Sequence, residues 1–401
     1  MRVLHIVITV LALAASATSA TTESIESSLT TESARSTGAL DPARTMSGSA
    51  AKARPRTPPQ APWTVRDDLG RTVALPARVG RIVSIQPEIS RMIISLGAGD
   101  RLVGIEYALR TQDHLFGIIY PAGARLPLVS MSENGVNVEE IFRLKPDLIF
   151  ASPFERQIVE SLQRKTSIPV LALASMGRFD RQAEILGLLG RILGREARAA
   201  ELTAYFDARI GHVREALRDI PESAKPRVFL SFWGVLTKTP IHYDPVDAAG
   251  GINVAEKSAP DVPGEINTLV SVERLIAWNP DLILVHGNYP PQDRKVTVES
   301  VRSDPRLASV KAVRNGKVRY TFGFWNWWDM AEVAIETLYL ARLLHPDKFP
   351  GFDLVREGNE VFRAFYGIEG GFSTLCGILR CGEWADVPAK EGIVPAELRH
   401  D

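Results

Sequence analysis

Two segments of the chain show the same order of polar and apolar positions. Residues 138–152 read VEEIFRLKPDLIFAS, and residues 272–286 read VERLIAWNPDLILVH. In each segment a short helical pattern stops at a proline, Pro146 or Pro280, because the residue before a proline disfavours the helical conformation. The apolar run that follows is typical of a strand buried on both faces. A unit of helix and strand that recurs half a chain apart predicts two similar α/β lobes.

Further apolar runs have the length of strands and are flanked by loop or helical patterns. They are residues 81–85, 168–172, 227–232 and 317–320. Strands that alternate with helices predict parallel sheets. Asn137, followed by Glu140, and Ser271 supply N-cap chemistry for the two repeated helices. The pattern therefore predicts an α/β protein with two Rossmann-like lobes and parallel sheets.

Two helical patterns lie between the repeats, at residues 181–193 and 196–220. The first ends at Gly194, a residue type favoured just beyond a helix C-terminus. The second would be roughly 35 to 40 Å long at 1.5 Å per residue. A helix of this length can connect two lobes, and a stiff connector permits only small changes in the angle between them.

The N-terminal part of the chain differs in composition from the rest. Residues 1–20 contain a basic start, an apolar run and small residues, which predicts a secretory signal peptide. A membrane anchor is the weaker alternative, because a spanning helix needs about 20 apolar residues. Residues 21–62 are rich in Ser, Thr, Ala and Pro and predict a disordered spacer. No cysteine follows the apolar run, so we expect a periplasmic protein without a lipoprotein anchor.

We divide the remainder by these patterns. The predicted parts are an N-terminal α/β lobe at 63–180, connecting helices at 181–220, a C-terminal α/β lobe at 221–345 and a C-terminal extension at 346–401.

Composition narrows the class of protein. The 401 residues contain 47 Lys plus Arg and 47 Asp plus Glu, so the formal net charge is zero and nothing favours a nucleic-acid partner. A charged ligand would have to be recognised by a few local arginines. Two cysteines, Cys376 and Cys381, exclude a disulfide-rich scaffold and a four-thiolate metal site. In an oxidising compartment their spacing favours a local disulfide. We assign no metal site.

Polar and aromatic residues follow several predicted strands, where parallel α/β sheets bind ligands. The candidate ligand-binding residues are Tyr107, Arg110, Trp233, His286, Tyr289, Phe324, Trp325, Trp327 and Trp328. The densest cluster has five aromatics in residues 322–328 and precedes a capping box, Asp329 to Glu332, that begins a helix. At least two of its three tryptophans are expected to be exposed as a platform for a bulky ligand. The alternative is that single aromatics of the cluster plug the core.

Other candidates are less specific. His286 and His242 could bind metal or donate hydrogen bonds, although a single histidine is more often structural. Arg110 and Arg178 could meet an anionic ligand group, or could remain solvated. The sequence contains no Gly-x-Ser-x-Gly elbow, no His-Glu-x-x-His and no Walker loop. This pattern favours a binding protein without a cofactor over an enzyme.

Several segments carry a resemblance to a known family. They are residues 81–88 (RIVSIQPE), 96–104 (LGAGDRLVG), 137–149, the second copy from Val272, and 340–346 (LARLLHP). Together they resemble the periplasmic substrate-binding proteins of ABC importers for iron–siderophore complexes, cobalamin and haem, over about residues 65–366. The resemblance implies the class III periplasmic-binding-protein fold, in which one long helix joins two lobes.

The resemblance also implies two docking residues. Glu139 and Glu273, at matching positions of the repeats, would contact arginines on an inner-membrane ABC permease. The alternative is that each acid only stabilises the first turn of its helix through the helix dipole.

We therefore expect a monomeric, extracytoplasmic binding component that captures a metal chelate between two lobes and delivers it to the permease. A ferric siderophore is favoured. Cobalamin, haem and metal oxyanions are alternatives on the same fold, and Tyr107, Tyr120 or Tyr289 could ligate haem. A secreted enzyme acting on a small molecule in the cleft is the alternative from another class. The spacer and the extension lie outside the family pattern.

Overall fold

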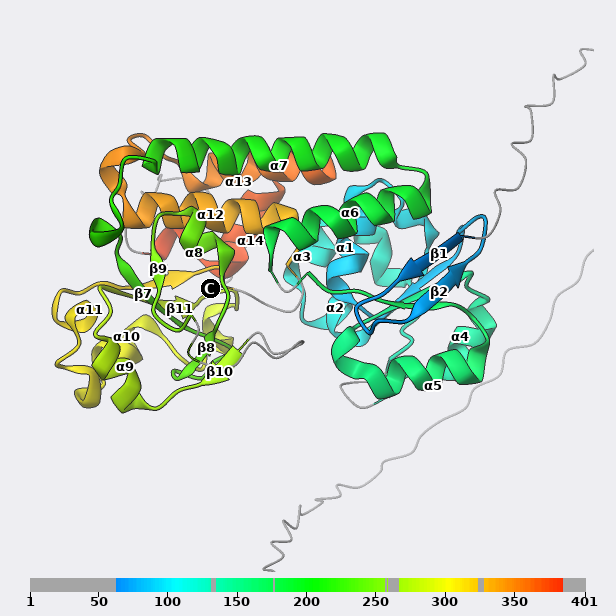
Figure 1. Cartoon of the computed structure of the whole chain (residues 1–401), viewed down its shortest axis with the longest axis horizontal. Helices are drawn as coiled ribbons and strands as arrows, with labels where there is room; N and C mark the ends of the chain where they lie inside the picture. The colour runs from blue at the N-terminus through cyan, green and yellow to red at the C-terminus, as the bar shows by residue number, and fades with distance from the viewer. Residues whose placement is uncertain are drawn as a thin grey trace, which may run out of the picture. The chain divides into compact units, whose positions relative to one another are not determined.

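The computed structural model describes residues 63–130, 135–175, 177–256, 258, 267–323 and 328–384. Two four-stranded sheets form the centre of this part of the chain (Figure 1). Among the described residues, no helix is both long and apolar enough to cross a membrane. The predicted signal peptide and spacer lie outside the described residues.

The N-terminal sheet has the strand order β4-β3-β5-β6, and all of its pairs are parallel. Its strands are β3 (Ile82–Ser84), β4 (Leu102–Ile105), β5 (Leu148–Ala151) and β6 (Val170–Ala172). Its helices are α1 (Pro87–Ser95), α2 (Tyr107–Thr111), α3 (His114–Ile119), α4 (Val138–Leu144) and α5 (Arg156–Thr166). The predicted strands at 81–85 and 168–172 are confirmed.

The C-terminal sheet has the order β12-β11-β7-β9 and is also parallel. Its strands are β7 (Arg227–Ser231), β9 (Ile252–Asn253), β11 (Leu282–His286) and β12 (Val318–Thr321). Its helices are α8 (Asp244–Ala248), α9 (Val272–Trp278), α10 (Val298–Arg302) and α11 (Lys311–Arg314), and β8 (Lys238–Pro240) pairs with β10 (Asn267–Leu269). In both sheets the first strand along the chain lies between the second and the third, so the two lobes share one topology.

The predicted duplication extends to individual hydrogen bonds. In the first copy, Asp147 donates its N–H to the carbonyl of Arg81 at 2.8 Å, and its carboxylate accepts the N–H of Arg81 at 2.8 Å. In the second copy, Asp281 makes the same two bonds with Arg227, both at 2.8 Å. Each Pro-Asp pair therefore ends a helix and also fixes where the next strand enters the sheet.

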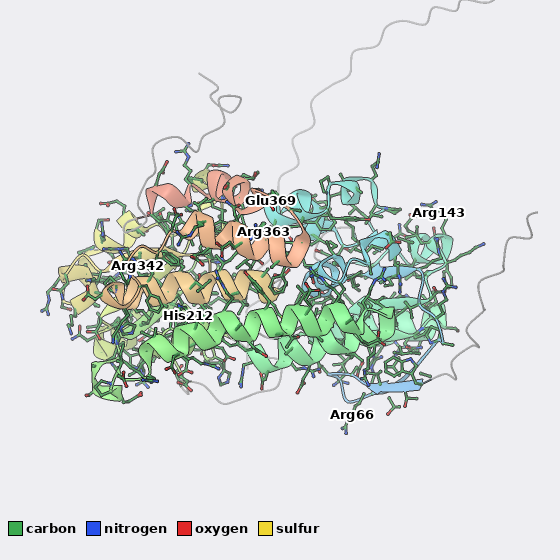
Figure 2. The ribbon with its side chains drawn as sticks, turned by 90° about the horizontal axis from the view of Figure 1, so that it is seen from above. Arg66, Arg143, His212, Arg342, Arg363 and Glu369 are labelled. Carbon is green, nitrogen blue, oxygen red and sulfur yellow. The ribbon has the colours of Figure 1, made fainter. Side chains whose placement is uncertain are left out.

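The connecting helices are α6 (Phe179–Leu193) and α7 (Glu196–Leu217), and Gly194 ends α6 in the left-handed conformation at φ 60°. The helix α7 packs against α6, α12 (Met330–Leu344) and α13 (Leu354–Tyr366), as Figures 1 and 2 show. Arg198 of α7 donates to the carbonyls of Ser95 in α1, at 3.3 Å, and Ala364 in α13, at 2.5 Å. The predicted connector is thus bonded to α1 of the N-terminal lobe and to α13 of the C-terminal extension.

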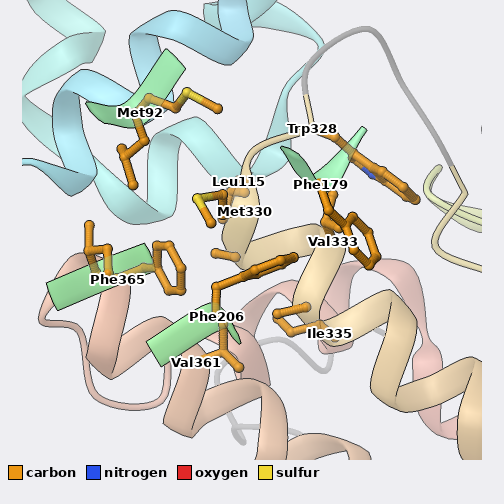
Figure 3. Packing of buried hydrophobic residues seen from close by; sticks show 14 of the residues in the cluster. Met92, Leu115, Phe179, Phe206, Trp328, Met330, Val333, Ile335, Val361 and Phe365 are labelled. Atoms are coloured by element: carbon orange, nitrogen blue, oxygen red, sulfur yellow. The ribbon is translucent and has the colours of Figure 1, made fainter. Parts of the chain in front are cut away.

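The largest hydrophobic cluster is common to both lobes. It combines one face of each sheet with α6, α7, α12 and α13, and Figure 3 shows Met92, Phe179, Phe206 and Val333 among its side chains. The opposite faces of the sheets pack against separate clusters. In β5, for example, Leu148 faces the common cluster and Ile149 faces the outer one, because successive strand residues point to opposite faces.

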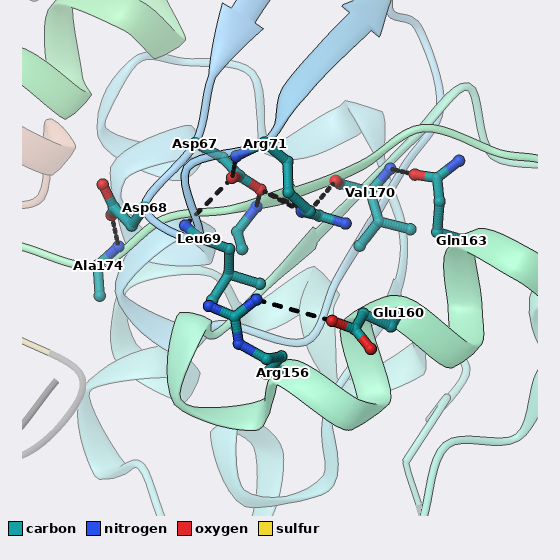
Figure 4. A network of polar contacts seen from close by, with 10 residues as sticks. Asp67, Asp68, Leu69, Arg71, Arg156, Glu160, Gln163, Val170 and Ala174 are labelled. Atoms are coloured by element: carbon teal, nitrogen blue, oxygen red, sulfur yellow. Dashed lines mark hydrogen bonds and ion pairs between the residues drawn. The ribbon is translucent and has the colours of Figure 1, made fainter. Parts of the chain in front are cut away.

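An N-terminal hairpin of β1 (Trp63–Arg66) and β2 (Thr72–Leu75) covers the edge of the N-terminal sheet. The carboxylate of Asp67 accepts the backbone N–H of Leu69 at 3.1 Å and the guanidinium of Arg71 at 2.5 Å (Figure 4). Arg71 also donates to the carbonyl of Val170 in β6 at 2.8 Å. The turn of the hairpin therefore supplies partners to an edge strand, which would otherwise expose unpaired backbone groups.

Cys376 and Cys381 are buried and unbonded to each other in the structure, and the disulfide that their spacing favours stays a prediction. Cys376 lies in α14 (Gly371–Leu379), and Cys381 begins a 3₁₀ turn after Arg380, which has a left-handed φ of 50°. This turn reverses the direction of the chain after α14 and brings Cys381 back to Cys376. The two thiols share a hydrogen bond.

Because the two thiols are in contact, protein folded in an oxidising compartment is expected to contain the disulfide. Alkylation of such protein after denaturation should modify neither cysteine, and alkylation after reduction should modify both. Protein folded in a reducing cytosol provides the control. Two reactive thiols in the secreted, denatured protein would contradict the expectation.

Two carboxylates are buried deep in the fold. Glu88 of α1 accepts hydrogen bonds from the hydroxyl and, at 3.2 Å, the N–H of Ser175. Glu336 of α12 accepts the hydroxyl of Tyr243 at 2.9 Å and the N–H of Phe322 at 3.1 Å. Burial raises the pKa of each to about 7 although these donors lower it. Both side chains therefore bind a proton more tightly in the folded state than in the unfolded state.

This raised pKa predicts a pH-dependent stability. A carboxyl whose pKa rises from 4.5 to about 7 on folding stabilises the protein below about pH 4.5, and that stability is lost as the pH rises towards 7. For Glu88 the loss amounts to about 3 kcal/mol at roughly 1.4 kcal/mol per pKa unit. Glu88→Gln should remove this part of the pH dependence between pH 5 and 8 in denaturant unfolding. Glu139→Gln, at an exposed position, is the control, and parallel profiles for wild type and Glu88→Gln would refute the assignment.

Candidate ligand-binding cleft

A cavity of about 250 Å³ lies between the loops that follow β4 and β11. Its wall combines residues of both lobes and of the C-terminal helices, which are Arg91, Thr111, Gln112, Asp113, His114, Leu115, Asn288, Tyr289, Pro290, Asp293, Glu332 and Leu375. Both loops leave the carboxyl ends of parallel strands, which is where α/β sheets bind ligands. The cavity is therefore the candidate ligand site.

Arg91 forms the charged base of this cavity. Its guanidinium binds the carboxylate of Asp113, with Nε at 2.8 Å and Nη2 at 2.7 Å, and also binds the carboxylate of Glu332. Burial lowers the pKa of Arg91, but the two neighbouring carboxylates outweigh it and the pKa is raised. Arg91 belongs to α1 and Glu332 to α12, so this ion pair joins the N-terminal lobe to the helix that follows β12.

The start of α12 differs in one respect from the predicted capping box. Asp329 is the N-cap and accepts the N–H groups of Ala331 and Glu332, as expected. The carboxylate of Glu332, however, binds Arg91, because the buried guanidinium needs a second anionic partner. Burial raises the pKa of Glu332, and the nearby Asp329 carboxylate adds to this.

The lining of the cavity is acidic. Asp113, Asp293 and Glu332 supply three carboxylates, Arg91 supplies one guanidinium that two of them already bind, and His114 supplies an imidazole. The arginines proposed for an anionic ligand are bonded elsewhere. Arg110 donates to the carbonyl of Leu126 at 3.0 Å, and Arg178 pairs with Asp244 at 3.3 Å. Both side chains are exposed, and their role towards an anionic ligand stays a prediction.

Tyr289 is the sequence-predicted residue that lines this cavity among those described. His286 lies behind it at the end of β11, with the two rings 4.8 Å apart. His286 is only 3% exposed, and burial lowers its pKa to about 3, so the imidazole is neutral. Its Nδ1 accepts the N–H of Trp233 at 3.4 Å, and its ring stacks on Phe232. His286 thus packs behind Tyr289 and supports the loop after β11, Gly287–Pro290, which is called the ligand loop below.

The other predicted ligand residues lie off the cavity wall. Tyr107 is 39% exposed at the start of α2, and Arg110 lies one turn further along that helix. Trp233 contacts the ammonium of Lys238, which lies 3.9 Å from the ring centre. Tyr120, named as a haem ligand, donates its hydroxyl to Gly99 at 2.9 Å.

Trp328 is buried and takes no part in an exposed tryptophan platform, so the prediction of two exposed tryptophans now depends on Trp325 and Trp327. It is 1% exposed and packs against Tyr243 beneath α12, with a distance of 5.4 Å between ring centroids. Its backbone carbonyl accepts the side-chain amide of Gln182 at 3.1 Å. The structural alternative, a plug in the core, holds for this residue. Phe324, Trp325 and Trp327 lie outside the described residues.

Glu139 and Glu273 occupy equivalent, exposed positions in the first turns of α4 and α9. Each helix precedes the strand that lies beside the first strand of its sheet, β5 or β11. Because each helix runs antiparallel to its sheet, its first turn lies at the carboxyl edge of the strands, the edge from which the cavity loops also leave. A hydrogen bond from its own backbone N–H lowers the pKa of Glu273, and Ser271 adds to this.

Sequence reasoning missed Arg91, Asp113 and Glu332. Each lies at a helix position where a charged residue is ordinary, and their partners are up to 241 residues apart in the chain. One signal was available, because Asp113 lies directly before an apolar helical stretch, and an N-cap there places its carboxylate at the start of α3.

The chain matches known proteins over most of its described length. Residues 82–322 match the sequence profile of the periplasmic binding protein family. The molybdate-binding protein MolA of Haemophilus influenzae is 24% identical over 329 residues, covering 75% of this chain and 90% of the relative. A cobalamin-binding protein of Halobacterium salinarum is 26% identical over 231 residues, covering 56% of this chain and 58% of the relative.

Solved structures share the fold. MolA bound to molybdate superposes with a TM-score of 0.65 at 21% identity, covering 77% of this chain and 98% of that one. Helicobacter pylori CeuE with Ni(II) bound has a TM-score of 0.62 at 19% identity, covering 77% and 97%. These neighbours are class III periplasmic binding proteins, as the resemblance implied. Members of the family are extracytoplasmic solute-binding proteins rather than enzymes, and they work with ABC permeases. With its profile match and its duplicated lobes, this chain belongs to the periplasmic binding protein family and is a substrate-binding protein of an ABC transporter.

Proposed function

We propose that the chain captures a metal chelate of neutral or positive charge in the cavity between the loops that follow β4 and β11. A ferric siderophore is the first candidate. The observation that carries this proposal is the acidic lining, in which three acids, Asp113, Asp293 and Glu332, outnumber the one guanidinium of Arg91, and two of them pair with it. Carboxylates disfavour an anion at short range and favour a cationic complex. These carboxylates would repel a free metal oxyanion.

The size and polarity of the cavity support a compact chelate. Its volume of about 250 Å³ lies below the roughly 300 to 1,000 Å³ usual for small-molecule sites. The ligand is therefore small, or a larger ligand places only its compact part between the two loops. Leu115, Leu375 and Tyr289 offer apolar contact to an organic framework, and Asn288 and Gln112 offer hydrogen bonds. Such a mixed wall suits a chelator that already surrounds its metal.

The proposed route continues from capture to delivery. The signal peptide predicted at residues 1–20 would export the chain, and the spacer at 21–62 would separate the lobes from its mature start. Glu139 and Glu273, one on each lobe, would then bind arginines of the permease. Their exposed positions at the cavity edge of the two lobes support this role.

Ligand identity is tested by titration against a panel. Quenching of tryptophan fluorescence should be measured with ferric hydroxamate and catecholate siderophores, the Ni(II)–histidine complex, cyanocobalamin, haemin and molybdate. We expect at least one chelate to bind with Kd below about 1 µM, which corresponds to roughly −8 kcal/mol. Asp293→Asn should weaken binding of a cationic chelate, and Asp347→Asn, an exposed position outside the cavity, is the matched control. Tight binding of molybdate, or no binding tighter than about 1 mM, would refute the chelate assignment.

Docking is tested separately from binding. The double variant Glu139→Ala with Glu273→Ala should bind its ligand with unchanged Kd but lower uptake of the radiolabelled complex by about tenfold or more in cells carrying the permease. The matched control replaces one exposed acid on each lobe at the opposite edge of its sheet, Asp100→Ala before β4 with Glu222→Ala before β7. Undiminished uptake by the docking variant would remove this role from the two glutamates.

A further inference from the structure

The C-terminal segment Gly371–Trp384 lies outside the family match, yet it contacts both walls of the cavity. Its helix α14 packs against α3 of the N-terminal lobe. Leu375 of α14 is 3% exposed and lines the cavity together with Leu115 of α3. The segment therefore supplies an apolar part of the wall that neither lobe provides.

Arg294 links this segment to the loop that carries Asn288 and Tyr289. Its Nη2 donates to the carbonyl of Leu379, the last residue of α14, at 2.6 Å, and to that of Gly287 at 3.3 Å. Its Nε donates to the carbonyl of Tyr289 at 3.0 Å. A cation at the C-terminus of a helix is stabilised by the helix dipole and satisfies carbonyls that have no partner within the helix. One guanidinium thus joins α14 to both ends of the ligand loop.

Trp384 adds a second contact between the segment and the C-terminal lobe. Its indole packs against Phe322, with ring centroids 4.8 Å apart, and against Tyr320 at 5.9 Å. A Cβ added at Gly287 would lie 2.9 Å from Cζ2 of this tryptophan, so glycine is required where the ligand loop begins. Arg294 also lies over the ring of Tyr320, 4.4 Å from its centre. The backbone of the ligand loop therefore contacts Arg294 and Trp384, and the side chains of Asn288 and Tyr289 line the cavity.

We infer that the segment Gly371–Trp384 is part of the ligand site, with Leu375 as a wall residue and Arg294 as the positioning residue that holds the loop Gly287–Pro290 in its binding conformation. The inference rests on the proposed function only in treating the cavity as the ligand site. Its structural content, a loop held by Arg294 against α14, is independent of which ligand binds.

Hydrogen–deuterium exchange on the full, unliganded chain tests that content. Arg294→Ala should raise exchange about tenfold in peptides covering 287–290 and 375–379, while the protected strands β7 and β11 and the melting temperature stay unchanged. Arg294→Lys should not restore protection, because a single ammonium on a flexible stem does not reproduce the planar fork. The control is Arg302→Ala, which removes an arginine that donates to the carbonyl of Gly316 at 2.9 Å, away from the cavity.

Equal exchange of the loop in Arg294→Ala and Arg302→Ala would overturn the inference. A second readout separates positioning from folding. With ferrioxamine B as the probe, Arg294→Ala should raise Kd about tenfold at an unchanged melting temperature, and Arg302→Ala should leave Kd as in wild type. Leu375→Trp, which fills the cavity, should weaken the same probe more than Thr374→Trp, its exposed neighbour on α14. If wild type does not bind this probe, ferrioxamine B is not the ligand, and the exchange experiment alone decides the role of the segment.

Discussion

The buried guanidinium of Arg91 sets the geometry of the cleft. A charge taken out of water is stable only when its partners are close and well aligned. Arg91 obtains them from two directions, Asp113 at the N-terminus of α3 and Glu332 in the first turn of α12. Because α12 belongs to the core shared by both lobes, Arg91 ties the N-terminus of α3 to that core, beside the packing of α3 against α14. The cavity wall that α3 carries is fixed by the same contact.

Shared burial adds a second constraint on the lobes. One hydrophobic cluster contains residues from both parallel sheets, from α6 and α7, and from the C-terminal helices. Changing the angle between the lobes would open this cluster to water at roughly 25 cal/mol per Å² of apolar surface. Arg198 and Arg294 add polar bonds from α7 and the ligand loop to the C-terminal helices. Ligand entry is therefore more easily accommodated by the loops at the cavity rim than by a rotation of whole lobes.

The sequence could predict those features whose cause is local. The duplicated lobes followed from Pro146 and Pro280 and the apolar runs after them, and both copies use the following aspartate to bind the first strand of their sheet. Gly194 and the periodicity beyond it located the connecting helices. Arg91 and Glu332 could not be paired from the sequence, because nothing local records a contact between residues 241 positions apart. Trp328 was placed wrongly because alternation in an extended loop was assumed, whereas this residue precedes the N-cap of α12 and packs against Tyr243.

The zero net charge of the chain has a more specific meaning once charges are located. Acidic groups are concentrated at the cavity, where Asp113, Asp293 and Glu332 gather, and single acids, Glu139 and Glu273, stand at the first turns of α4 and α9. Arginines away from the cavity are bonded to carbonyls and carboxylates there, as Arg110 and Arg178 are. A neutral chain can thus present a negative cavity and two exposed carboxylates without a long-range field. Recognition of a cationic ligand and of a basic permease surface would then both depend on contacts within about 8 Å, the screening length at physiological ionic strength.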